Sequence, residues 1–118
     1  MNQLEQQLLR DNVGDAEPRL RLRTNTRIDT GRWWRKTPLW LCVMEDELVL
    51  LSVSRRRYFE RRPLAESKQT HYNHSTGELV IEPAETLQYN NCNLTPRDAL
   101  RVLNFLKTET KNKTLITE

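Results

Sequence analysis

The stretch that decides the fold lies early in the chain and reads Arg19-Leu20-Arg21-Leu22-Arg23-Thr24-Asn25-Thr26-Arg27-Ile28. Long polar side chains alternate in it with leucine, threonine and isoleucine. A period of two is typical of a β-strand with one buried face and one face in water. Residues 19–28 therefore predict a strand that packs on a core, and the Asp-Thr-Gly sequence at residues 29–31 is expected to end it.

The chain then alternates short apolar or β-branched runs with turn residues, which predicts an antiparallel meander. Trp40 lies within the first apolar run and is expected in the core, whereas the triplet 55–57 is expected to form a turn. Pro63 restricts the strand that precedes it. The remaining predicted strands span residues 39–43, 48–53, 58–62, 70–73, 78–82 and 86–90, with residues 32–38 as a connection or a further short strand.

The end of the chain changes from strands to a helix. Thr95 is an expected N-cap, Pro96 suits the first helical position, and Asp98 places an acid in the first turn. Apolar residues then recur at helical spacing on one face. One amphipathic helix is predicted over residues 96–108, and residues 111–118 are expected to form a flexible tail.

Length and composition bound the architecture. A chain of 118 residues has room for one domain, and 36% hydrophobic residues are enough for a single economical core. Residues 1–18 predict a short helix followed by a flexible linker, and residues 19–110 the domain itself. No apolar run has the length of a membrane span and no signal peptide is recognised, so a cytoplasmic location is expected.

The basic residues are concentrated in one region. Between Arg19 and Arg62 there are twelve Lys or Arg against five Asp or Glu, a balance of +7 within a total of +3. Most of the basic residues are arginines, whose planar guanidinium suits phosphate, carboxylate and aromatic partners. Two interpretations stay open at this point, an anionic partner or a solvated strand face.

Nothing in the sequence points to catalysis. His71 and His74 have no third metal ligand at a recognisable spacing, and no nucleophile motif or glycine-rich phosphate loop is present. Cys42 and Cys92 are separated single cysteines, which we expect to be structural thiols in a reducing compartment. We therefore expect no enzyme activity, no metal and no cofactor.

The order of these elements resembles the pleckstrin-homology-like fold, the PH-like fold. Residues 31–36 (Gly-Arg-Trp-Trp-Arg-Lys), 39–43 (Leu-Trp-Leu-Cys-Val) and 46–51 (Asp-Glu-Leu-Val-Leu-Leu) are similar to the first hairpins of bacterial members of this family. The resemblance covers residues 19–108 and implies a mainly β domain, in which about seven antiparallel strands form a partly open barrel or orthogonal sandwich capped by one C-terminal α-helix. Residues 39–43 lack the basic residue that lipid-binding members carry there, so the resemblance implies a module used for protein contact rather than for inositol-phosphate binding.

The leading hypothesis is therefore a module that contacts a protein or peptide partner and self-associates or joins a larger assembly. The hypothesis places the contact either at an open sheet edge or at Trp33 and Trp34, which are adjacent and so point to opposite faces of a strand. The flanking cations that complete this candidate site are Arg32, Arg35 and Lys36. The alternative for these side chains is core packing with a cation–π contact.

A second hypothesis concerns an anionic surface, either phospholipid or nucleic acid. It rests on the densest group of arginines, which near such a surface contribute about 1 kcal/mol each. The opposite interpretation is a solvated turn whose arginines pair with nearby acids. The residues of this alternative site are Arg55, Arg56, Arg57, Arg61 and Arg62.

Overall fold

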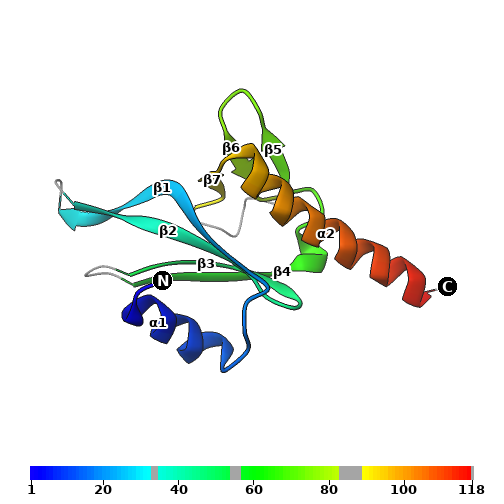
Figure 1. Cartoon of the computed structure of the whole chain (residues 1–118), viewed down its shortest axis with the longest axis horizontal. Coiled ribbons are helices and arrows are strands. Elements are labelled where there is room, and N and C mark those ends of the chain that lie inside the picture. The colour runs from blue at the N-terminus through cyan, green and yellow to red at the C-terminus, as the bar shows by residue number, and fades with distance from the viewer. Residues whose placement is uncertain (33–34, 54–56, 83–88, 118) are drawn as a thin grey trace.

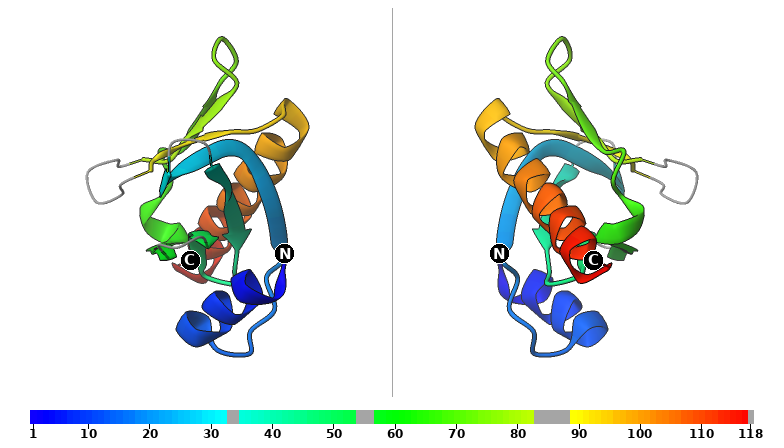
Figure 2. Two further views of the ribbon diagram at one scale, coloured as in Figure 1. Left: turned by 90° about the vertical axis from the view of Figure 1, so that its left-hand side faces the viewer. Right: turned by 90° about the vertical axis from the view of Figure 1, so that its right-hand side faces the viewer.

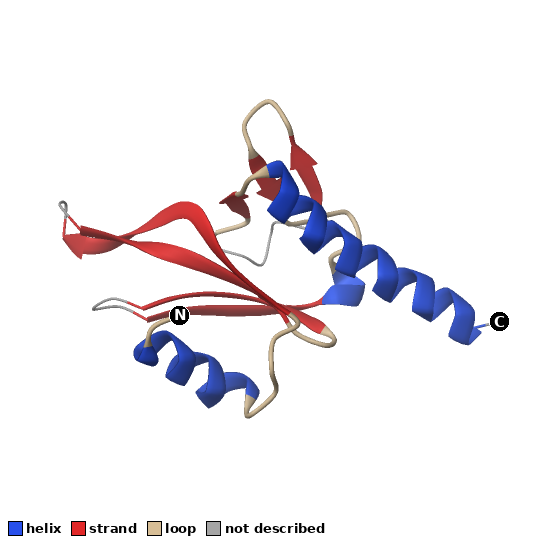
Figure 3. Cartoon of the chain, in the orientation of Figure 1, coloured by secondary structure: helices blue, strands red, loops and turns tan. Residues whose placement is uncertain are grey.

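The computed structural model describes residues 1–32, 35–53, 57–82 and 89–117, with residues 29–32, 35–36 and 108–117 described in their backbone alone. In this part of the chain, two antiparallel sheets lie between an N-terminal and a C-terminal helix (Figures 1 and 3). The prediction of a mainly β chain with a closing helix is confirmed. The elements are α1 (Gln3–Val13), β1 (Leu20–Arg32), β2 (Arg35–Val43), β3 (Glu47–Val53), β4 (Arg57–Pro63), the 3-10 turn η1 (Leu64–Glu66), β5 (His71–Asn73), β6 (Glu78–Val80), β7 (Asn91–Asn93) and α2 (Pro96–Thr117).

The larger sheet is a meander with the strand order β1-β2-β3-β4. Its central hairpin joins β2 to β3 in the register Val43↔Leu48, with the acidic residues Glu45 and Asp46 between the two strands. β3 is buried on both faces. Double burial explains why residues 48–51 are uniformly apolar, whereas β1, which has one exposed face, alternates.

β1 is longer than predicted. The Asp-Thr-Gly sequence at residues 29–31 does not end it, because pairing with β2 continues to Asp29↔Lys36 and Arg32↔Arg35. The ladder absorbs these residues in a register shift between Asp29 and Arg32, a β-bulge of the kind that glycine tolerates. Of residues 32–38, expected as a connection or a further short strand, Arg32 ends β1 and residues 35–38 begin β2, while residues 33–34 lie outside the described residues.

The smaller sheet has the order β5-β6-β7, and its first two strands, which lie within the predicted strands 70–73 and 78–82, form a hairpin whose turn contains Gly77. Gly77 has a φ of 73°, a conformation that residues with a Cβ rarely adopt. The last strand lies at Asn91–Asn93 and not at residues 89–90, while residues 86–88 lie outside the described residues. Cys92 fixes this position because it is fully buried between two exposed asparagines.

The predicted helix start is confirmed, since the Asp98 amide donates to Thr95 Oγ1 at 3.3 Å. Ala99, Val102 and Leu106 then pack into the core that the two sheets share. The predicted end at residue 108 is wrong: α2 runs to Thr117 and projects beyond the sheets (Figure 1). No glycine or proline interrupts residues 108–117, and the backbone continues as a helix past Leu106.

The larger sheet has a core on each face. Its inner face packs against the smaller sheet and α2 through a cluster of sixteen buried side chains among those described, including Leu41, Leu50 and Leu79. Its outer face is covered by α1, whose Leu8 and Leu9 pack on Cys42, Val49 and Leu51. Figures 1 and 2 show α1 on the opposite side of this sheet from α2. The short helix predicted in residues 1–18 is thus present and forms a layer of the fold.

None of the helices in the described part of the chain is both long enough and apolar enough to cross a membrane.

Candidate functional site

Of the five residues of the predicted partner site, the structure describes three, Arg32 at the end of β1 and Arg35 and Lys36 at the start of β2. Trp33 and Trp34 lie outside the described residues, so the hypothesis for these two side chains remains a prediction. Arg32 and Arg35 face each other in the register of the two strands, and Lys36 pairs with Asp29. The hairpin therefore brings the backbone of the three flanking cations together at the end of the larger sheet.

The structure separates the members of the predicted arginine cluster. Arg55 and Arg56 lie outside the described residues, and Arg57 at the start of β4 is exposed. Arg61 is exposed on the outer face, whereas Arg62 is only 6% exposed on the inner face. Neighbouring strand residues point to opposite faces, so Arg61 and Arg62 do not share one surface.

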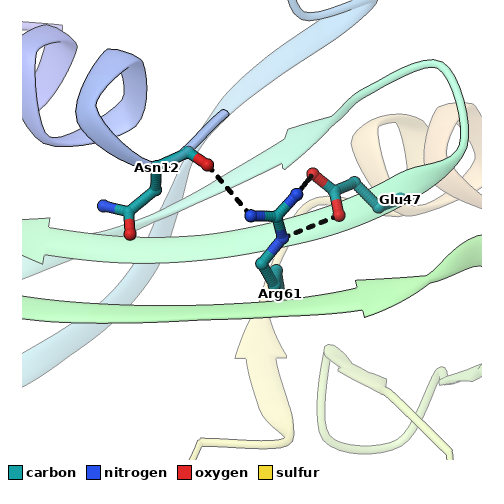
Figure 4. Close-up of polar contacts among 3 residues, drawn as sticks. All are labelled: Asn12, Glu47 and Arg61. Atoms are coloured by element: carbon teal, nitrogen blue, oxygen red, sulfur yellow. Dashed lines mark hydrogen bonds and ion pairs between the residues drawn. The ribbon is translucent and has the colours of Figure 1, made fainter. Parts of the chain in front are cut away.

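The Arg61 side chain is hydrogen-bonded to two other residues, Glu47 and Asn12 (Figure 4). Its Nε and Nη2 donate to the two carboxylate oxygens of Glu47 at 2.9 and 2.7 Å, and its Nη1 donates to the Asn12 carbonyl at 2.9 Å. The Glu47 carboxylate raises the pKa of Arg61 further above its usual value. The Arg61 guanidinium therefore links β4 to β3 and to the last turn of α1. Each of its three nitrogens donates a hydrogen bond within the molecule.

The outer face carries a second feature beside α1, a group of half-buried apolar side chains. Trp40, Val53 and Phe59 are each half-buried and pack at the edge of the core under α1. They come from three adjacent strands, because Trp40 pairs with Leu51 and Leu51 with Phe59. We call these three residues the outer-face patch. Trp40, predicted in the core, thus lies at its border, and its buried Nε1 has no hydrogen-bond partner among the described residues.

Arginines stand on both sides of the outer-face patch. Arg23 pairs with Trp40 across the β1–β2 ladder, and Arg27 pairs with Pro38. On the other side Arg57 pairs with Val53. All three arginines are exposed, and none forms an ion pair with the described residues. An apolar centre with a cationic border suits a partner that presents apolar side chains next to acidic ones.

The arginines of β1 were not singled out as a site from the sequence, although the signal was present. Arg19, Arg21, Arg23 and Arg27 are the polar half of the alternating stretch and all are exposed. Alternation places residues on a face but does not identify that face. Only the register with β2 reveals that Arg23 and Arg27 lie beside Trp40 and Pro38.

The remaining candidate groups are isolated. His71 and His74 are exposed. The rings of His74 and Tyr72 pack in a T-shaped arrangement, with their centroids 4.9 Å apart. No group of three potential metal ligands occurs within the described ranges. Cys42 and Cys92 are free and buried in different cores, and burial raises the pKa of each thiol to about 12. Their expected role as structural thiols fits this burial.

The chain was compared with models of protein families, with curated proteins and with solved structures, and none of the three comparisons gave a match.

Proposed function

We propose that this chain is a non-enzymatic interaction module of the PH-like type, which binds a protein or peptide partner on the outer face of its larger sheet. The order of four strands, three strands and a closing helix supports the fold assignment. The two buried free thiols suit a reducing compartment, so the proposal includes a cytoplasmic location.

One observation carries the functional part, the outer-face patch with its border of arginines. Aromatic anchors surrounded by arginine are the composition in which interface hot spots are enriched. Trp40 and Phe59 supply the anchors, and the inner-face core supports them from the other side of the sheet. The occupant that fits is a segment with a large apolar side chain followed by Asp or Glu. The end of the β1–β2 hairpin, with Arg32, Arg35 and Lys36, extends the same contact in this proposal.

The arginine border favours a protein partner over an extended anionic surface. Arg61 is occupied by Glu47, and Arg62 faces inward. The cations of the described residues that remain on this face are therefore spaced around an apolar centre. Such spacing suits a short acidic segment better than a membrane or nucleic acid, which require a continuous row of cations.

The test is a selection of random twelve-residue peptides displayed on phage against the full chain. We expect enriched peptides to combine Trp, Phe or Leu with Asp or Glu. Their affinity, measured by fluorescence polarisation, is expected to fall by about 2 kcal/mol or more in the Phe59→Ala variant. Arg57→Glu is expected to weaken binding in a way that added salt reproduces.

Arg97→Glu is the matched control for the charge reversal, because Arg97 is also exposed but belongs to α2, which lies on the other side of the larger sheet. Equal binding of the selected peptides to Phe59→Ala and the original chain would exclude the outer-face patch. Flotation with acidic vesicles at physiological salt would favour the anionic-surface alternative. A solution mass that doubles with concentration and returns to the monomer value in Phe59→Ala would identify a second copy of the chain as the occupant.

A further inference from the structure

The middle of β1 carries a wide bulge that side chains hold in place. Arg23 pairs with Trp40 and Arg27 with Pro38, so four steps along β1 correspond to two along β2. Within the bulge, the buried hydroxyl of Thr24 donates to the Leu39 carbonyl at 2.7 Å and accepts from the Thr26 amide at 3.2 Å. The bulge is thus a built feature of the strand and not a frayed segment.

The bulge also connects to the smaller sheet. The hydroxyl of Thr26 accepts a hydrogen bond of 2.7 Å from the amide of Asn93 in β7. Contacts on both sides therefore fix the backbone from residue 24 to residue 26. A fixed backbone gives the flanking arginines a defined separation, and this lowers the entropy lost when a ligand binds between them.

A cavity of about 350 Å³ opens at the bulge, and Arg23, Thr24, Asn25, Arg27 and Pro38 line it. This volume is within the range of small-ligand sites. Arg23 and Arg27 share the outer side of the strand because their partners, Trp40 and Pro38, are two residues apart on β2. Two guanidinium groups and the side chain of Asn25 therefore border one opening.

The charge of this cavity is not compensated by the residues described around it. Neither Arg23 nor Arg27 forms an ion pair with the described residues, and none of the described residues that line the cavity is acidic. A second cavity, of about 410 Å³ between α1 and β1, provides the contrast. It too contains two arginines, but Asp15 and Glu17 line it as well, and Glu17 binds Arg21 at 3.1 Å.

The geometry points to an oxoanion site at the β1 bulge, where Arg23, Arg27 and Asn25 bind a phosphate group, free or as a small monoester. Two planar guanidinium forks match a dianion with three acceptor oxygens better than they match a single carboxylate, which has two. Asn25 adds an amide donor between the two arginines. This inference deepens the proposed function, since the cavity opens beside Trp40 and would recognise the anionic part of a ligand on the same face.

The test is a titration of the full, ¹⁵N-labelled chain with inorganic phosphate at pH 7.5 and constant ionic strength, followed by amide chemical shifts. We expect saturable shifts centred on residues 23–27, with sodium chloride at equal ionic strength producing none. Arg23→Gln and Arg27→Gln are each expected to weaken phosphate binding by about tenfold, the loss of one charge-assisted contact. Arg19→Gln, directly before the start of β1 and outside the cavity, is the matched control and is expected to bind as the original chain does.

O-phosphoserine and glycerol 3-phosphate distinguish the sources of the phosphate group. Tighter binding of either monoester than of inorganic phosphate identifies a phosphate carried on a larger molecule, and equal binding identifies the free ion. Shifts that never saturate, or an equal loss in Arg19→Gln, would overturn the site. Small anions probe the cavity without any peptide, so failure here leaves peptide binding at the outer-face patch unaffected, and the converse also holds.

Discussion

Arg61 and Arg62 are neighbours in the sequence, yet their side chains meet opposite environments. Arg61 faces α1 and water, while Arg62 is buried on the side of the main core. A charge count along the chain treats them as one cluster, but strand geometry sends them to different faces. The function of each arginine is therefore decided by its position on the strand and by the acid it meets.

The contacts of Arg61 predict a structural role that can be measured. We expect Arg61→Ala to lower the free energy of unfolding by about 1 kcal/mol, because a two-oxygen ion pair and a hydrogen bond to the Asn12 carbonyl are lost at a partly exposed site. Urea denaturation measures this difference. Arg57→Ala, which removes a cation without an ion pair from the same strand, is expected to change stability by less than about 0.5 kcal/mol. Equal losses in both variants would contradict the role of Arg61.

The buried thiols predict how stability depends on pH. Burial raises the pKa of Cys42 and Cys92 from 9.0 to about 12, although the charge of Arg21 partly offsets the shift at Cys42. Above pH 9 the unfolded chain loses these protons while the native chain keeps them, so stability is expected to fall as pH rises from about 9 towards 12. Desolvation also raises the pKa of Tyr58, which adds a loss of the same sign.

Urea denaturation at pH 8 and pH 10 tests this slope. The Cys42→Ala variant is expected to have a lower free energy of unfolding at both pH values, because the substitution leaves a small cavity. Its free energy of unfolding should fall less between pH 8 and pH 10, because one buried thiol is gone. A native chain whose stability is unchanged or higher at pH 10 would show that the thiols do not control this range.

At the scale of elements, the sequence predicts what depends on local periodicity and turn chemistry. The alternating residues 19–28, the acidic turn before β3 and the Thr95 cap all specify their structure within a few neighbours. The length of β1, the bulge and the position of β7 depend on pairing with distant residues. The outer-face patch was missed for the same reason, since Trp40, Val53 and Phe59 are brought together only by the register of three strands.

The bulge of β1 depends on one side chain, which gives a prediction at this scale. Thr24→Val keeps the shape of the side chain but removes its hydroxyl, which donates to the Leu39 carbonyl and accepts from the Thr26 amide. We expect a loss of about 1–3 kcal/mol in stability, because a buried carbonyl and a partly buried amide lose their partner. Thr95→Val removes a hydroxyl from the exposed cap of α2 and is the comparison variant. Amide shifts should change along residues 23–27 only in Thr24→Val.

At the scale of the whole molecule, the larger sheet separates two cores of unequal size. The inner core joins both sheets and α2, while the outer core contains, among the described residues, six buried ones, two of them on the eleven-residue helix α1. A helix of this length is marginal by itself. It is stabilised by Leu8 and Leu9 and by its capping box, in which the Glu5 amide donates to Asn2 Oδ1 and the Asn2 amide donates to Glu5 Oε1, each at 2.8 Å.

This asymmetry predicts that the molecule opens in two steps. The amides of α1 are expected to exchange with solvent through detachment of the helix, at a lower free energy than the amides of β2 and β3, which require unfolding of the whole domain. Hydrogen exchange of the native chain, followed residue by residue by NMR, measures both opening free energies.

Leu8→Ala removes packing from the outer core alone, so it should reduce protection in α1 much more than in β2. Val102→Ala, in the inner core, should reduce protection throughout, because both sheets and α2 depend on that core. Equal losses of protection in α1 and β2 in the Leu8→Ala variant would contradict this prediction. They would show that α1 unfolds in the same cooperative unit as the sheets, so that α1 does not detach separately to expose the outer face of the larger sheet.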